Sequence, residues 1–150
     1  MQTQDWISLA KQFEDYGKQE TRARKNFTAL AQICGFLDAS RFGQDLVHCV
    51  DRPGQLVLRC RNGSHPTKFL RVMSIIDDQI EFCLRDDATN VERYFQPHEP
   101  HHHALERFKE VVGSINWAKP VSPPSPSERV LAWSRFLFVG RYGTWQSRKD

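Results

Sequence analysis

Residues 68–85 have the sequence KFLRVMSIIDDQIEFCLR, in which two apolar runs flank a pair of aspartates. Both runs are rich in β-branched and aromatic residues with a period of two, which is typical of strands, and Asp77-Asp78 is typical of a turn. The pattern continues on both sides and predicts an antiparallel meander of four or five strands. The candidate strands are residues 46–50, 55–61, 68–76, 79–85 and 92–96.

The first 38 residues carry an apolar stripe with alternating spacings of three and four, which is the period of a helix. Its members are Trp6, Leu9, Phe13, Tyr16, Ala23, Phe27, Leu30, Cys34 and Leu37, and Glu20 interrupts it. A continuous helix of about 34 residues would be about 50 Å long, whereas a body of this size has a radius of gyration of about 13 to 14 Å. We therefore expect the helix to break near Gly17 or Gly35 and to pack on the sheet. The alternative is a projecting coiled coil, which the large aromatic residues disfavour.

Residues 96–103 contain four of the six histidines. Neutral imidazoles bind zinc, so His98 and His101 form a candidate metal site, with Glu99 or His65 as further ligands. His101, His102 and His103 would point about 100° apart at a helix start and cannot converge on one ion. The structural alternative is that Pro100 begins an amphipathic helix. Its apolar stripe would be Ala104, Leu105, Phe108, Val111, Val112 and Ile115.

The net charge of +3 lies entirely in residues 120–150, because residues 1–119 contain 16 basic and 16 acidic groups. A neutral body lacks the basic excess with which nucleic-acid binders usually neutralise phosphates. The meander nevertheless offers a candidate basic aromatic platform for stacking RNA bases. Its members are Arg59, Arg71, Arg85 and Arg93, with Phe69 and Phe95 among them. A two-residue turn at Asp77-Asp78 would place Arg71 and Arg85 on opposite faces, and a three-residue turn would place them on one face.

Catalytic signatures are missing from the chain. There is no GxSxG, GxxxxGK[ST] or GxGxxG motif. Cys34, Cys49, Cys60 and Cys83 lie in apolar or strand-like stretches without CxxC spacing, which predicts buried thiols rather than disulfides or a zinc site. These features favour a non-enzymatic protein without a cofactor, although catalytic groups assembled from distant residues would leave no motif. Since no apolar run has signal-peptide or membrane-spanning length, we expect a cytoplasmic protein.

The C-terminal segment differs in composition from the rest. Residues 119–127 form a Pro/Ser-rich linker, and residues 128–150 are apolar, aromatic and basic. Ser125-Pro126-Ser127-Glu128 matches a capping box and Gly140 suits a helix end, so we expect a helix over about residues 126–139. Burying its apolar side chains is worth roughly 1.5 to 3 kcal/mol each. The candidate contact residues are Val130, Trp133, Leu137, Phe138, Tyr142 and Trp145.

The sequence therefore predicts an α+β body over residues 1–118, with a long N-terminal helix, a four- to five-stranded antiparallel meander and a second amphipathic helix. The linker and the C-terminal helix follow. We expect a small interaction protein, an adaptor, inhibitor or accessory subunit, whose C-terminal helix and body surface bind a protein partner. The helix could instead dock on its own body, on a sister chain or, against its low Lys/Arg density, on a membrane surface. The alternatives are a metal-dependent enzyme at His98 and His101, or nucleic-acid binding through the arginines and the basic tail.

Overall fold

The computed structural model describes residues 5–49, 54–61, 65, 67–75 and 78–121, with the side chains of residues 96–99 left aside. Eleven elements follow one another in this part of the chain. They are α1 (Trp6–Gln19), η1 (Thr21–Ala23), α2 (Arg24–Ala39), α3 (Phe42–Asp45), β1 (Leu46–His48), β2 (Gln55–Cys60), β3 (Lys68–Ile75), β4 (Gln79–Asp86), β5 (Val91–Pro100), η2 (His101–His103) and α4 (Ala104–Ser114).

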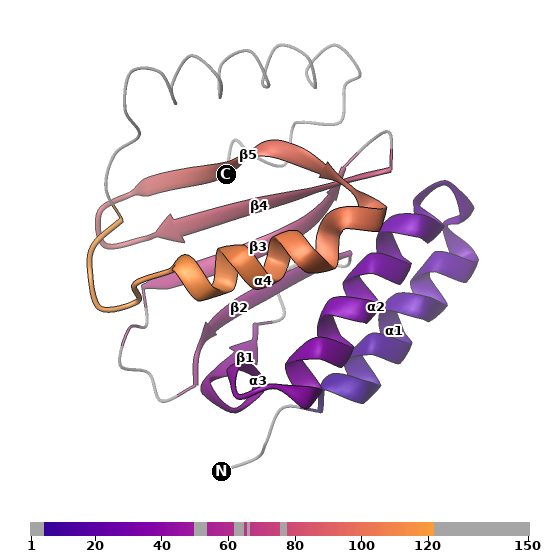
Figure 1. The fold of residues 1–150 in the computed structure, drawn as a ribbon, viewed down its shortest axis with the longest axis horizontal. Helices are drawn as coiled ribbons and strands as arrows, with labels where there is room; N and C mark the ends of the chain where they lie inside the picture. Colours follow the sequence, from indigo (N-terminus) through magenta and orange to yellow (C-terminus); the bar gives the residue numbers. More distant parts are fainter. Residues whose placement is uncertain (1–4, 50–53, 62–64, 66, 76–77, 122–150) are drawn as a thin grey trace.

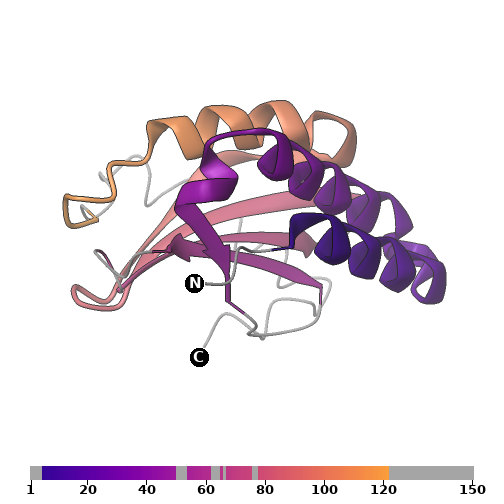
Figure 2. The same cartoon turned by 90° about the horizontal axis from the view of Figure 1, so that it is seen from below.

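The fold is α+β, as predicted, and has two layers (Figures 1 and 2). The five strands form one antiparallel sheet in the order β1-β2-β3-β4-β5, which is the expected meander. The helices α2 and α4 lie across one face of this sheet, and α1 packs beside α2 (Figure 2). In the described part of the chain, the opposite face carries no helix.

The N-terminal helix breaks near Gly17, as predicted, and forms a hairpin. α1 ends at Gln19, the backbone leaves the helical region at Glu20, and α2 begins at Arg24 after the short η1 turn. Gly17 is buried, and a Cβ atom there would lie 3.3 Å from the Cβ of Phe27. The glycine therefore lets the two helices approach closely beside the turn. Folding back removes the excess length of a continuous helix.

The connection between β3 and β4 fixes which side chains share a face. Ile75 pairs with Gln79, so three residues, 76–78, join the strands. The two-residue turn is therefore wrong. The expected three-residue turn would pair Ile76 with Ile80, and the observed pairing has the same parity, so Arg71 and Arg85 share a face. Loop residues with positive φ are Gly54 at 82°, Asp78 at 56° and Asn90 at 54°, all of types that tolerate this region. The sequence Arg52-Pro53-Gly54-Gln55 suits a type II turn, and Gly54 has the positive φ that such a turn requires at its third residue, while Arg52 and Pro53 lie outside the described residues.

The core lies between the sheet and the helices. One face of the sheet contributes six side chains with no solvent exposure, and α2 and α4 contribute apolar side chains from above. The sheet residues are Leu56, Leu58, Leu70, Val72, Ile80 and Phe82, and the helix residues include Leu30, Ile33, Leu37 and Phe108. We call this side of the sheet the helix-covered face.

β5 is longer than predicted and lies at the edge of the sheet. It runs from Val91 to Pro100 and includes Pro97, whose missing N–H group is tolerated where no further strand pairs. Pro100 therefore ends the strand and does not begin the helix, which corrects the prediction. η2 follows at His101, and α4 begins at Ala104. Four members of the predicted stripe are buried: Ala104, Phe108, Val111 and Val112.

The chain after α4 returns to the end of the sheet. Val121 is 7% exposed, and its N–H donates to Oδ2 of Asp86 over 3.4 Å. The Lys68 ammonium group donates to the Trp117 carbonyl. These contacts hold the last described residues against β3 and β4. Most of the predicted linker and the whole C-terminal helix, residues 122–150, lie outside the described part.

Candidate functional site

Three of the four arginines of the predicted platform share the face of the sheet that carries no described helix. Arg71 lies opposite Val57 and Cys83, and Arg85 lies opposite Phe69. Because side chains alternate along a strand, Arg59, two positions after Val57, points to the same side. Tyr94, opposite Cys83, joins them. We call the surface formed by Arg59, Phe69, Arg71, Arg85 and Tyr94 the arginine face.

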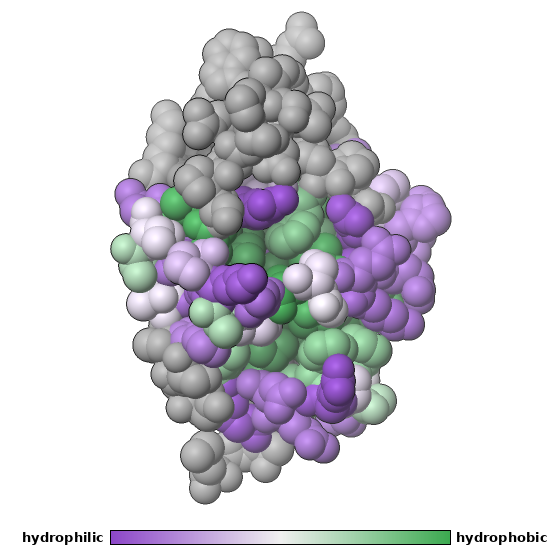
Figure 3. Space-filling view, turned by 60° about the vertical axis from the view of Figure 1, so that its left-hand side comes forward, coloured by the Kyte–Doolittle hydropathy of each residue, from purple (hydrophilic) through white to green (hydrophobic). Residues whose placement is uncertain are grey.

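Arg93 does not belong to the arginine face. It pairs with Leu84, and Phe95 pairs with Phe82, so both lie on the helix-covered face. There they line a pocket of about 370 Å³ with Ile115 and Val121. Figure 3 brings this side of the molecule forward and shows hydrophobic surface at its centre, bordered by hydrophilic residues. The sheet thus separates Arg93 and Phe95 from the other members of the predicted platform.

The charge on the arginine face is largely balanced. The Nε of Arg85 lies 2.6 Å from Oδ1 of Asp87, and its Nη1 lies 2.8 Å from Oε1 of Glu92. These hydrogen bonds, first that of Asp87 and then that of Glu92, raise the pKa of Arg85. Tyr94 donates its hydroxyl hydrogen to the other oxygen of Glu92 over 2.7 Å. A phosphate would compete with two carboxylates for Arg85, which weakens the case for nucleic acid.

The centre of the arginine face is shielded from solvent. Val57 is 3% exposed, and Glu81 and Cys83 are each 1% exposed. All three lie on this face by the strand register. Arg71 and Tyr94 beside them are half-buried, while Arg59 is exposed. This centre is therefore already covered within the chain, and the arginine and aromatic side chains around it form the accessible part of the face.

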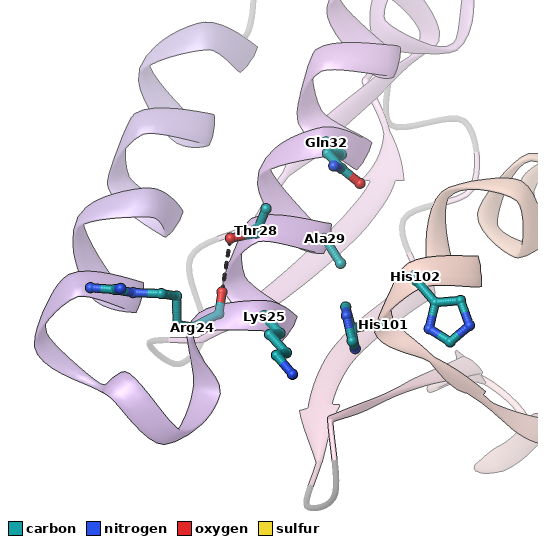
Figure 4. Close-up of a pocket in the computed structure, with 7 residues that line it drawn as sticks. All are labelled: Arg24, Lys25, Thr28, Ala29, Gln32, His101 and His102. Atoms are coloured by element: carbon teal, nitrogen blue, oxygen red, sulfur yellow. Dashed lines mark hydrogen bonds between the residues drawn. The ribbon is translucent and has the colours of Figure 1, made fainter.

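The histidine segment forms one wall of a second pocket. His101 and His102 of η2 line a pocket of about 410 Å³ between η2 and α2, which we call the α2–η2 pocket. Its other lining residues are Arg24, Lys25, Thr28, Ala29 and Gln32 (Figure 4). The two imidazole centroids are 5.3 Å apart with their planes at 76°. His103 is exposed and does not line this pocket.

The predicted pair of metal ligands is described only in part. His98 lies in β5, but its side chain and that of Glu99 fall outside the described residues. His101 lies in the α2–η2 pocket. Among the side chains that are described, no group of three His, Cys, Asp or Glu residues could hold a metal ion. The pairing of His98 with His101 stays a prediction.

None of the four cysteines, all of which are described, forms a disulfide. Cys34 and Cys83 are buried as predicted, while Cys49 and Cys60 are half-buried. Burial raises the pKa of the Cys34 thiol to about 12. Burial, followed by the charge of Asp45, also raises the pKa of Cys60. High thiol pKa values disfavour the thiolate, so these two cysteines suit packing better than nucleophilic chemistry.

The predicted partner-binding residues, Val130, Trp133, Leu137, Phe138, Tyr142 and Trp145, all lie outside the described residues. Sequence reasoning missed the polar side of α2 that lines the α2–η2 pocket. Lys25, Ala29 and Gln32 recur at helical spacing, but a polar stripe on a helix is the ordinary sign of a solvated face. Only the fold brings it opposite the histidines.

No protein-family model, curated protein or solved structure matches the chain. Among the described helices, none has both the length and the apolar composition needed to cross a membrane. The functional proposal therefore rests on the surfaces described above.

Proposed function

We propose that the protein is a small non-enzymatic interaction protein that binds a protein partner through its C-terminal segment, residues 128–150, and the arginine face. The body acts as a rigid platform, and the segment supplies an apolar helix. The helix contacts would be Val130, Trp133, Leu137 and Phe138, with Tyr142 and Trp145 beyond its end. The expected partner is a protein with an apolar groove, because an amphipathic helix buries its apolar side in such a groove.

The arginine and aromatic side chains around the buried centre of the arginine face are the observation that carries this proposal. Val57, Glu81 and Cys83 are almost fully buried, although none of the described helices lies on that face. Arginine and aromatic side chains surround this centre, and these residue types are enriched in protein interfaces. These exposed and half-buried side chains are the part of the face that a protein partner would contact.

The end of the described chain supports the use of the C-terminal segment. Val121 is fixed to Asp86 at the end of β4. The six residues of the linker that follow, 122–127, are rich in proline and serine. In an extended polyproline conformation they would span about 19 Å at 3.1 Å per residue. The segment would therefore start from a fixed point and could reach a partner placed against the arginine face.

Photo-crosslinking tests the proposal. In the full chain, p-benzoylphenylalanine replaces Trp133 on the apolar side of the expected helix or, as the matched control, Arg135. Two residues along a helix correspond to about 200°, so the two probes lie on opposite sides. After irradiation in an extract of the source cells, we expect Trp133 but not Arg135 to crosslink to a second polypeptide. Crosslinks from Trp133 only to its own body, mapped by mass spectrometry, would contradict partner binding and indicate docking within the chain.

A further inference from the structure

The α2–η2 pocket joins segments that are about seventy residues apart in the sequence. Lys25, Ala29 and Gln32 point from α2 toward the side on which His101 and His102 lie (Figure 4). Arg24 lines the edge of the pocket, and its side chain points away toward α1 (Figure 4). Thr28 directs its hydroxyl hydrogen to the Arg24 carbonyl over 2.9 Å, so this hydrogen is already used within α2. Lys25, Gln32 and the two imidazoles remain as the polar groups that a ligand could contact.

The polar groups of the pocket are mainly hydrogen-bond donors. Lys25 and Arg24 carry permanent positive charge, the Gln32 amide offers two N–H groups, and each neutral imidazole offers one. Among the described residues that line the pocket, none carries a carboxylate. Asp78 lies 3.8 Å from the Lys25 ammonium group, and both side chains are exposed. An exposed ion pair of this kind contributes little to stability, so a bound anion could take its place.

The start of α2 adds to the positive potential. Arg24 and Lys25 occupy the first turn of this 16-residue helix, and the N-cap residue Ala23 offers no side-chain hydrogen bond. The partial positive charge of a helix N-terminus favours an anion placed nearby. A metal cation would instead be repelled by Lys25 and would find no carboxylate among the described lining residues. Charge thus selects an anion over a metal ion at this pocket.

We propose that the α2–η2 pocket binds a small organic phosphate monoester. The phosphate group contacts Lys25, Gln32 and His101, and the organic part rests on an apolar wall formed by Ala29 and the carbon atoms of the other lining side chains. A volume of about 410 Å³ exceeds the needs of inorganic phosphate and falls within the usual range of small-molecule pockets. This site lies between α2 and η2, so the proposal stands independently of residues 128–150.

The test is an NMR titration of the ¹⁵N-labelled full chain with phenyl phosphate, with phenol as the uncharged counterpart and inorganic phosphate as the bare anion. We expect saturable shifts of the Lys25, Gln32 and His101 amides with phenyl phosphate and none with phenol. Lys25→Gln or His101→Gln should weaken binding about tenfold, because each removes one charge-assisted or neutral hydrogen bond to the phosphate. Inorganic phosphate should bind more weakly, since it leaves the apolar wall uncovered.

Two matched control variants distinguish binding in the pocket from general attraction of the ligand to a basic surface. His103→Gln changes the neighbouring exposed histidine, and Lys18→Gln changes an exposed lysine of α1 that pairs with Asp15 over 3.6 Å. Both should bind phenyl phosphate as the unmodified chain does. The proposal is overturned by the absence of saturable shifts at roughly 10 mM ligand. Three other results would overturn it too. Lys18→Gln could weaken phenyl phosphate binding as much as Lys25→Gln does, inorganic phosphate could bind as tightly as phenyl phosphate, or His101 could bind zinc saturably in place of phosphate. The dispersion of each spectrum confirms that the variant is folded.

Discussion

The position of His48 in the sheet disfavours its protonated form. Its Nδ1 lies 3.2 Å from the Val57 nitrogen, whose hydrogen it accepts when unprotonated, and 3.2 Å from the Val57 carbonyl oxygen, to which it donates when protonated. Burial lowers the pKa of His48 below its ordinary value of 6.5, and a contact with the Val57 carbonyl opposes this shift only in part. Protonation of His48 therefore costs more in the folded chain than in the unfolded chain.

The free energy of unfolding should consequently fall as the pH drops below about 6.5. The unfolded chain then binds a proton at His48 that the folded chain does not bind, so acid favours unfolding. Urea unfolding between about pH 8 and pH 5 measures this slope. His48→Gln should make the slope shallower, and His103→Gln, at an exposed position, should leave it unchanged. Equal slopes for His48→Gln and the unmodified chain would contradict the assignment. The pKa of the Asp86 carboxyl is also lowered, so its titration changes the free energy of unfolding mainly below its ordinary pKa of 3.8.

Two glycines show how differently the helices tolerate a methyl group. At Gly43 in α3, a Cβ atom would lie 1.9 Å from the Leu37 carbonyl oxygen and 2.9 Å from Nε1 of Trp6. The same residue's carbonyl accepts hydrogen bonds from Trp6 over 3.0 Å and from Arg61 over 2.8 Å. At Gly35 in α2, an added Cβ meets no atom of the described chain within 4 Å.

We therefore expect opposite effects from the same substitution. Gly43→Ala should lower the free energy of unfolding by about 1 to 3 kcal/mol or more, because the contact with the Leu37 backbone cannot be relieved by a side-chain rotation. Gly35→Ala should raise it by about 0.5 to 1 kcal/mol through helix propensity. Urea unfolding of both variants measures the difference. A neutral Gly43→Ala variant would show that α3 does not pack against the end of α2 as described.

The strands and helices could be predicted because each has a regular apolar period. The meander, the break near Gly17 and the stripe of α4 all follow from spacing within one segment. The sequence could not reveal how the strands align across their loops. Arg93 seemed to belong with Arg59 and Arg71, yet the turn between β4 and β5 places it on the other face. Which side chains share a face of the sheet depends on the lengths of all the loops together, and each loop has several allowed lengths.

The candidate sites were predicted less completely than the elements. His101 was identified from the local density of histidines, but its neighbours Lys25 and Gln32 lie about seventy residues earlier. No pattern within one segment links them, since the contact arises when α2 and α4 pack on the same face of the sheet. The burial of Glu81 was also unexpected, because a glutamate in a strand ordinarily marks a solvent-facing position.

At the scale of the whole molecule, Asp86 joins three separate parts of the chain. Its carboxylate accepts hydrogen bonds from the Thr67 hydroxyl over 2.9 Å, the Ala88 N–H over 3.0 Å and the Val121 N–H over 3.4 Å. Burial opposes its ionisation, but these hydrogen bonds and the nearby Lys68 outweigh that cost and lower the pKa of Asp86. The residues after α4 are therefore tied to the sheet by a charged, buried acceptor.

Val121 is the last described residue, and it packs against the core of the body. In the full chain, Val121→Ala should lower the free energy of unfolding by about 1 to 3 kcal/mol, because it leaves a cavity beside the core. Lys119→Ala, at an exposed neighbouring position, should change it little. A chain ending at Val121 should keep this contact and remain a soluble monomer by light scattering, with its free energy of unfolding close to that of the full chain. Aggregation of that shortened chain would instead mean that residues 122–150 complete the core, and it would remove the basis for partner binding by the C-terminal segment.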